Sequence, residues 1–386
     1  MSIDRTPTKV PGQDSAVGGP ADSDAVADAD SYRFLVSIHH PAQSHFYRHA
    51  IDELRARGHR VRVCVRDKEI ASDLLTAYGI RHRVLSRSAG TFPRVALTQA
   101  AYEAKLLREA WRFDPDVMTS IGGIEISHIA PLVGARALAF TDTPSRFARW
   151  ITAPSLDATC TPAAVGGGVR GEQRSYDGYQ ELAYLHPDRF EHDPDRLRAF
   201  GVDPRDRNFL VRFVGWGAYH DVEAHGLSMP QKRELLSVLS DHGNVYVTSE
   251  RELPAELRDY DLPVPPHLVH DLLAVSDLYV GDSGTMATEA AVLGTPAVRV
   301  ASVVADGDLA NFVELEEEYG LLETFADGDR TIEAIERLLD DPELQDRWQR
   351  RRERLLSEKI DVTAYAVEQL ERLGARARQE PHALYE

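Results

Sequence analysis

The chain has 386 residues, of which 43% are hydrophobic and 27% are charged, values typical of a soluble globular protein with more than one domain. Its 62 acidic and 44 basic residues give a net charge of −18, which disfavours binding to nucleic acid phosphates. No apolar run approaches the roughly 18 residues that a transmembrane helix needs, and two cysteines cannot form a disulfide framework. We therefore expect a cytoplasmic protein with no transmembrane segment and no nucleic acid partner.

The basic residues comprise five lysines and thirty-nine arginines. An acidic, lysine-poor surface suits strong salt, where screening removes the repulsion between like charges, so we expect a halophilic protein. A GC-rich genome, whose codons favour Arg and Ala, is the alternative explanation.

The first thirty residues differ in composition from the rest of the chain. They are rich in Asp, Ala, Gly, Pro and Ser and show no apolar periodicity. They also lack the basic start and apolar centre of a signal peptide. We therefore predict a disordered acidic tail over residues 1–30.

From residue 32 onward, short apolar runs alternate with segments of helical apolar spacing. This alternation predicts a parallel sheet covered by helices on both faces, in a first domain over residues 31–165. The expected strands of this domain cover residues 32–38, 60–65, 82–85, 116–120, 137–140 and 158–160, and its longer helices cover residues 43–57, 69–78 and 94–112.

Residues 166–206 contain three consecutive glycines, scattered Pro and Asp, and little periodicity, which predicts an interdomain connection. A second alternating series covers residues 207–341, and helices with a short tail cover residues 342–386. The sequence therefore predicts an α/β fold with two Rossmann-like, doubly wound domains facing across a cleft, followed by a C-terminal helical segment. The expected strands of the second domain cover residues 208–214, 244–248, 278–280 and 297–300.

The segment from Leu278 to Pro296 combines a strand, a tight turn and a helix. Ser283, Gly284 and Thr285 stand where the helix begins, so their backbone N–H groups and the helix dipole favour an anion. Glycine also lets a phosphate approach the backbone closely. This turn is therefore a candidate anion site.

Glu289 lies one turn further along the same predicted helix, and its side chain leans back toward the helix start. A carboxylate repels phosphate but accepts hydrogen bonds from a ribose diol. A nucleotide with its diphosphate at the turn and its ribose on Glu289 is therefore a coherent hypothesis. The alternative is structural, because a Ser-Gly-Thr turn can cap a helix and an early glutamate complements its dipole.

Gly281-Asp-Ser-Gly-Thr, Glu289 and Leu-Gly-Thr-Pro296 together resemble the donor-binding segment of GT-B glycosyltransferases and of the related UDP-N-acetylglucosamine 2-epimerases. In those families the Ser-Gly pair binds the diphosphate and the glutamate binds the ribose hydroxyls. Over residues 32–373 the chain more specifically resembles a prokaryotic family called domain of unknown function 354. The matching signals are His40-Pro41, residues 178–187 (GYQELAYLHP), Val211-Arg-Phe with Ala218-Tyr-His220, and residues 285–296 (TMATEAAVLGTP).

The resemblance implies a GT-B fold and metal-independent sugar transfer, with a nucleotide-sugar as substrate and no further cofactor. The implied acceptor is a glycan or a lipid-linked molecule. In inverting GT-B enzymes a base often follows the first strand, so His45 is the candidate base for the acceptor hydroxyl, with His40 as its competitor. Hydrogen bonding and helix capping are the structural alternatives for both histidines.

Two acidic residues follow later strands of the first domain, at the sheet edge where doubly wound folds bind ligands. In the epimerase relatives, acidic residues of corresponding loops move a sugar proton. Glu125 and Asp142 are therefore candidate acid/base groups. The alternative is that they cap helices or lie on the surface.

Arg212 lies near the end of the first strand of the second domain, and His220 follows in a glycine-rich loop. A cation at either position would neutralise the leaving diphosphate, which GT-B enzymes do without a metal. A structural salt bridge is the alternative.

A basic cluster lies on the C-terminal helical region. It either touches anionic lipid headgroups, which would give peripheral membrane contact, or forms a solvated face paired with nearby glutamates. The cluster comprises Arg350, Arg351, Arg352 and Arg354.

We interpret the chain as a glycosyltransferase-like enzyme that transfers sugar from a nucleotide-sugar to a glycan or lipid-linked acceptor. One alternative is a UDP-sugar 2-epimerase-like enzyme, in which Glu125 and Asp142 exchange a proton on the donor. A second alternative is a non-catalytic nucleotide-sugar-binding protein of surface-glycan biosynthesis.

Overall fold

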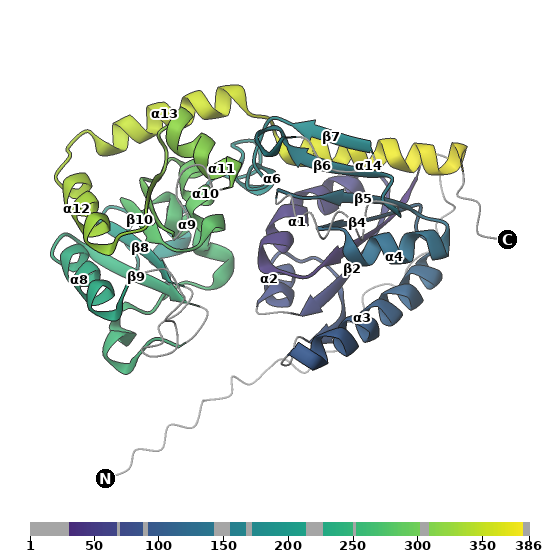
Figure 1. Cartoon of the computed structure of the whole chain (residues 1–386), viewed down its shortest axis with the longest axis horizontal. Helices are drawn as coiled ribbons and strands as arrows, with labels where there is room; N and C mark the ends of the chain where they lie inside the picture. The colour runs from purple at the N-terminus through teal and green to yellow at the C-terminus, as the bar shows by residue number, and fades with distance from the viewer. Residues whose placement is uncertain are drawn as a thin grey trace, which may run out of the picture. The chain divides into compact units, whose positions relative to one another are not determined.

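Two parallel sheets form the framework of the computed structural model, which describes residues 31–67, 70–87, 92–142, 155–166, 172–213, 227–249, 252–301 and 309–380. The first sheet has seven strands in the order β3-β2-β1-β4-β5-β6-β7 (Figure 1). Each is hydrogen-bonded to its neighbours in parallel, as the predicted alternation requires. The strands are β1 (Arg33–Ile38), β2 (Arg60–Asp67), β3 (Arg83–Arg87), β4 (Val117–Ile121), β5 (Arg136–Phe140), β6 (Ala158–Pro162) and β7 (Glu172–Tyr176).

Helices cover both faces of the first sheet. Helices α3 (Phe92–Phe113) and α4 (Ile124–Val133) pack on one face, where Leu35 and Met118 join their apolar residues in one buried cluster. Helices α1 (Pro41–Ala56) and α2 (Ala71–Ala77) pack against Phe34 and Val36 on the other face. This two-sided burial explains why the central strands are almost continuously apolar.

The segment between the sheets contains more regular structure than expected. Strand β7 lies in the stretch predicted as a connection, and it pairs with β6 at the edge of the first sheet. Its sequence (EQRSY) is mostly polar because an edge strand is only partly buried, so apolar patterning does not reveal it. The remaining elements of this segment are the short turn η2 (Ala163–Val165) and helices α6 (Leu182–Leu185) and α7 (Pro194–Arg198).

The second sheet has five parallel strands in the order β12-β11-β10-β8-β9. They are β8 (Asn208–Phe213), β9 (Asn244–Ser249), β10 (Leu278–Gly281), β11 (Ala297–Val300) and β12 (Glu323–Phe325). The last of these was not expected from the sequence. The associated helical elements are α8 (Met229–Ser240), η3 (Ala255–Tyr260), η4 (Pro266–Leu268), α9 (Val269–Ala274), α10 (Gly284–Leu293), α11 (Ala310–Val313), the π-helical turn η6 (Glu314–Glu318) and α12 (Gly328–Leu339).

Two long helices close the chain, as predicted. Helix α13 (Leu344–Glu358) packs against α10, whereas α14 (Val362–Gln379) returns to the first half and contacts α1, α6 and β5 (Figure 1). One buried apolar cluster includes side chains of both sheets and of α14. Both cysteines, Cys64 and Cys160, are buried free thiols. Among the described helices, none has the length and apolarity needed to cross a membrane.

Candidate functional site

The turn between β10 and α10 presents two backbone donors that have no acceptor among the described residues. Ser283 caps α10, and its Oγ accepts a long hydrogen bond of 3.4 Å from the N–H of Met286. Within the described residues, no acceptor lies at hydrogen-bond distance from the N–H groups of Gly284 and Thr285, and both residues are partly exposed. These two amides stand at the positive end of a ten-residue helix and are available to an anion.

Two arginines flank this turn on the neighbouring strands. Arg212 of β8 and Arg299 of β11 are both in register with Gly281 of β10, so all three project toward the same face of the sheet. The guanidinium of Arg299 lies 3.8 Å from the ring centre of Phe312, and a Cβ added to Gly284 would lie 2.6 Å from the same ring. Sequence reasoning identified Arg212 and missed Arg299, although both interrupt otherwise apolar strands.

Gly281 is required where the strand enters the turn. A Cβ at this position would lie 2.5 Å from the carbonyl oxygen of Arg212 and would also clash with the hydroxyl of Tyr279. We expect Gly281→Ala to lower the free energy of unfolding by about 1–3 kcal/mol, because the sheet backbone must shift to admit the methyl group. Urea denaturation checks this expectation, and an unchanged midpoint would show that the strand moves without cost.

Glu289 is a buried residue, 3% exposed, and its carboxylate is held by two protein groups. Its Oε1 accepts a hydrogen bond of 2.7 Å from the hydroxyl of Tyr184 on α6 and lies 3.0 Å from Nε2 of His270 on α9. Its Oε2 has no partner in the described part of the chain. Glu289 therefore has a structural role that the sequence did not reveal, and one carboxylate oxygen remains for a ligand.

His45, the predicted base, lies in the same buried group of aromatic rings. Its ring stacks on Tyr184 and makes an edge contact with His270 at a centroid distance of 4.6 Å. Its Nδ1 lies 2.8 Å from the hydroxyl of Tyr78. Burial, followed by the charges of His270 and Arg48, holds the pKa of His45 well below its ordinary value. The imidazole is therefore neutral, but the protein itself surrounds it.

A different histidine, His39, pairs with the predicted acid Glu125. Its Nε2 lies 2.9 Å from Oε1 of Glu125 and 3.0 Å from Oγ of Ser37. Its Nδ1 has no partner within the described residues, and its side chain is 20% exposed. Burial opposes ionisation of Glu125, but the charge and hydrogen bond of His39 outweigh it and lower the pKa of Glu125 to about 2. Glu125 is therefore an anion that orients the imidazole.

Sequence reasoning missed His39 because four histidines follow the first strand within eleven residues. The available signal was position: His39 directly follows β1, at the carboxyl edge where the N-terminus of α4 brings Glu125. His40 instead caps α1 through Nδ1, which accepts from the N–H of Ala42 at 3.3 Å, and its side chain is exposed.

The other predicted site residues fall in separate places. Asp142 follows β5 and is partly exposed, and its charge raises the pKa values of Tyr176 and Glu181 after the larger effect of burial. His220 lies outside the described residues. Arg212 donates from Nη1 to Oγ1 of Thr248 at 3.2 Å.

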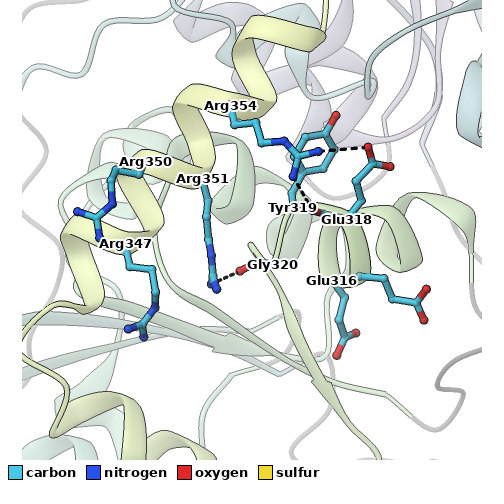
Figure 2. A pocket seen from close by; sticks show the side chains of 9 residues that line it. Glu316, Glu318, Tyr319, Gly320, Arg347, Arg350, Arg351 and Arg354 are labelled. Atoms are coloured by element: carbon cyan, nitrogen blue, oxygen red, sulfur yellow. Dashed lines mark hydrogen bonds and ion pairs between the residues drawn. The ribbon is translucent and has the colours of Figure 1, made fainter.

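The basic cluster of the C-terminal region contributes to a pocket of about 550 Å³ between α13 and the end of η6 (Figure 2). Arg354 pairs with Glu318 and Glu358, and Arg351 donates to the carbonyl of Gly320 at 2.6 Å. Arg352, which does not line this pocket, donates to the carbonyl of Val292. The paired helical face that was one of the two expectations is therefore present, and contact with lipid headgroups stays a prediction.

Within the described ranges, no group of three or more His, Cys, Asp or Glu side chains is placed to hold a metal ion. The backbone amides of the α10 turn and two arginines lie at the second sheet. The His39–Glu125 pair lies at the first sheet. Such a set can bind an anionic ligand and remove a proton from a hydroxyl.

A family model described as "Protein of unknown function (DUF354)" matches residues 34–353. No protein of curated function matches the sequence. A UDP-GlcNAc 2-epimerase from Neisseria meningitidis, solved with UDP-GlcNAc, is similar with a TM-score of 0.63 and 14% identity, over 88% of this chain and 100% of that chain.

Two further solved structures are similar to this chain. The spinosyn forosaminyltransferase SpnP has a TM-score of 0.59 and 16% identity, over 89% of this chain and 100% of that one. The UDP complex of MnaA from S. aureus has a TM-score of 0.60 and 14% identity, over 88% and 95% of the two chains. At these identities the similarity shows the fold, which is the GT-B fold predicted from the sequence.

Proposed function

The chain belongs to the family of proteins of unknown function DUF354, and from that premise we propose that it binds a nucleotide-sugar and transfers the sugar to a glycan or lipid-linked acceptor. The observation that carries this proposal is the pair of backbone amides at Gly284 and Thr285, which have no acceptor among the described residues. Arg212 and Arg299 lie beside them on the two strands next to β10. Amide donors and guanidinium groups together match a diphosphate. Oε2 of Glu289 would accept from the ribose.

His39 is the residue that we assign as the base, in place of His45 or His40. Nε2 of His39 lies 2.9 Å from Oε1 of Glu125, and this carboxylate would favour the tautomer with the proton on Nε2 and the lone pair on Nδ1. Nδ1 would take the proton of an acceptor hydroxyl as that oxygen attacks the anomeric carbon. Glu125 would then stabilise the imidazolium that forms. The diphosphate would leave onto the α10 amides and the arginines, without a metal.

A UDP-sugar epimerase is the second candidate, which the similarity to UDP-GlcNAc 2-epimerases supports. Glu125 and Asp142 follow the neighbouring strands β4 and β5, whose carboxyl ends lie at one edge of the sheet. In this reaction they would exchange a proton on the sugar of the donor itself. Incubation with UDP-sugars in deuterated water separates the two candidates, because only epimerisation places solvent deuterium in the sugar without an acceptor.

We expect a nucleoside diphosphate and its sugars to raise the thermal unfolding midpoint, measured in molar salt across UDP-, GDP- and dTDP-sugars, with CMP-sugars as the comparison that carries a single phosphate. A ligand that binds only the folded state stabilises it by about 2.7 kcal/mol at a concentration one hundred times its Kd. Uridine is the matched control for UDP, because it lacks the diphosphate that the amides and arginines would bind. If no nucleotide raises the midpoint, or if uridine and UDP act equally, the proposed diphosphate site is wrong.

A further inference from the structure

The segment between β7 and α6 carries buried polar groups that the proposed mechanism does not use. The hydroxyl of Tyr176, whose residue is 3% exposed, has no hydrogen-bond partner within the described residues, and the same is true of the buried Nε2 of Gln180. Buried polar groups are nearly always hydrogen-bonded, and an unpaired one costs about 1–3 kcal/mol. Two such groups within five residues of each other indicate a polar partner that the described residues do not supply.

Glu181 adds a carboxyl group to this segment. It is 7% exposed and, in the described part of the chain, it has no ion pair and no hydrogen bond to another side chain. Burial, followed by the charge of Asp142 and then of Glu289, raises the pKa of Glu181 well above its ordinary value. Glu181 therefore keeps its proton to a higher pH than an ordinary glutamate, and in the protonated form it can donate a hydrogen bond as well as accept one.

Glu181 immediately precedes α6, which contacts α10, and the two carboxylates that raise its pKa belong to the elements of the two proposed half-sites. Asp142 follows β5 of the first sheet, and Glu289 lies on α10, the helix that would hold the nucleotide. Tyr184, three residues after Glu181, donates directly to Glu289. Asp142 and Glu181 both raise the pKa of Tyr176, after the larger effect of burial.

We propose that Tyr176, Gln180 and Glu181 bind the hydroxyl groups of the sugar carried by the nucleotide, an inference that rests on the proposed function. Sugar hydroxyls donate and accept, which matches a phenol, an amide donor and a carboxyl group. The nearby Asp142 and Glu289 carboxylates repel a second anion. The site therefore selects a neutral sugar over a uronic acid.

Calorimetric titration of the full chain with UDP, UDP-N-acetylglucosamine and UDP-glucuronic acid tests this inference. We expect wild type to bind UDP-N-acetylglucosamine more tightly than both UDP and UDP-glucuronic acid. Tyr176→Phe and Glu181→Leu should each lose about tenfold of the affinity added by the sugar, while their affinity for UDP stays unchanged. Glu181→Gln, which keeps an N–H donor at this position, should retain most of it.

Tyr365→Phe is the matched control, because its ring lies 5.1 Å from that of Tyr176 but its hydroxyl already contacts Sγ of Cys160. This variant should leave unchanged the affinity that the sugar adds over UDP. The proposal is overturned if the affinity that the sugar adds over UDP survives both Tyr176→Phe and Glu181→Leu. It is also overturned if the variants lose UDP and UDP-sugar affinity equally, or if wild type binds the three nucleotides equally.

The outcome also separates this inference from the proposed function. If wild type binds no nucleotide, the proposed function fails, and titration with free N-acetylglucosamine then decides the sugar site. If wild type binds free N-acetylglucosamine and the Tyr176→Phe variant does not, the sugar site is supported without the nucleotide site. Absence of that binding overturns the sugar site as well.

Discussion

Replacing His39 with alanine is expected to lower the rate of sugar transfer by about 10²–10⁴-fold while nucleotide affinity stays within twofold of wild type. The expected loss follows from the geometry of the pair, in which Glu125 lies 2.9 Å from Nε2 and leaves Nδ1 without a partner in the described residues. The change removes the proton acceptor but no group of the α10 turn. Initial rates with a nucleotide-sugar and an acceptor, together with calorimetry of nucleotide binding, measure both quantities.

Two further variants make this result specific. Glu125→Gln keeps the shape of the side chain but removes the charge that stabilises the imidazolium, so it should reduce the rate less than His39→Ala does. His40→Asn preserves a helix cap at the neighbouring position and should leave the rate nearly unchanged. If the His40 variant loses the rate of sugar transfer and the His39 variant keeps it, His40 is the base instead of His39.

Replacing Glu289 with leucine is expected to lower the free energy of unfolding by about 2–5 kcal/mol and to weaken nucleotide binding. The leucine leaves the Tyr184 hydroxyl and the His270 imidazole buried without the acceptor they share, at a cost of about 1–3 kcal/mol for each group. It also removes Oε2, the oxygen assigned to the ribose. Urea denaturation measures the first effect, and calorimetry on the folded variant measures the second.

Glu289→Gln separates the structural role from the binding role. Its amide oxygen can still accept from Tyr184, so the loss of stability should be smaller than for leucine. Its amide group is a weaker acceptor than a carboxylate for a ribose diol, so nucleotide affinity should still fall. A glutamine variant with wild-type nucleotide affinity would leave Glu289 with its structural role only.

Local sequence determined the architecture and the α10 turn. Apolar runs that alternate with helical segments predicted parallel strands with covering helices. A central strand that is buried on both faces of a sheet needs a nearly continuous run of apolar residues. The strand, turn and helix at Leu278–Gly281 and Gly284–Leu293 lie where the sequence predicted them. Their signals are short-range: a serine cap, glycines in the turn and helical apolar spacing all act within a few residues.

Contacts between residues distant in the sequence were decided only by the tertiary structure. The position of His39 directly after the first strand was the only local signal among the histidines considered, and it does not indicate that this residue meets Glu125. The partners of Glu289 come from α6 and α9, and β7 joins the first sheet through pairing rather than apolar patterning. Apolar periodicity indicates which face of an element is buried. The identity of its neighbours depends on how all the elements pack, and it is this packing that brings His39 next to Glu125.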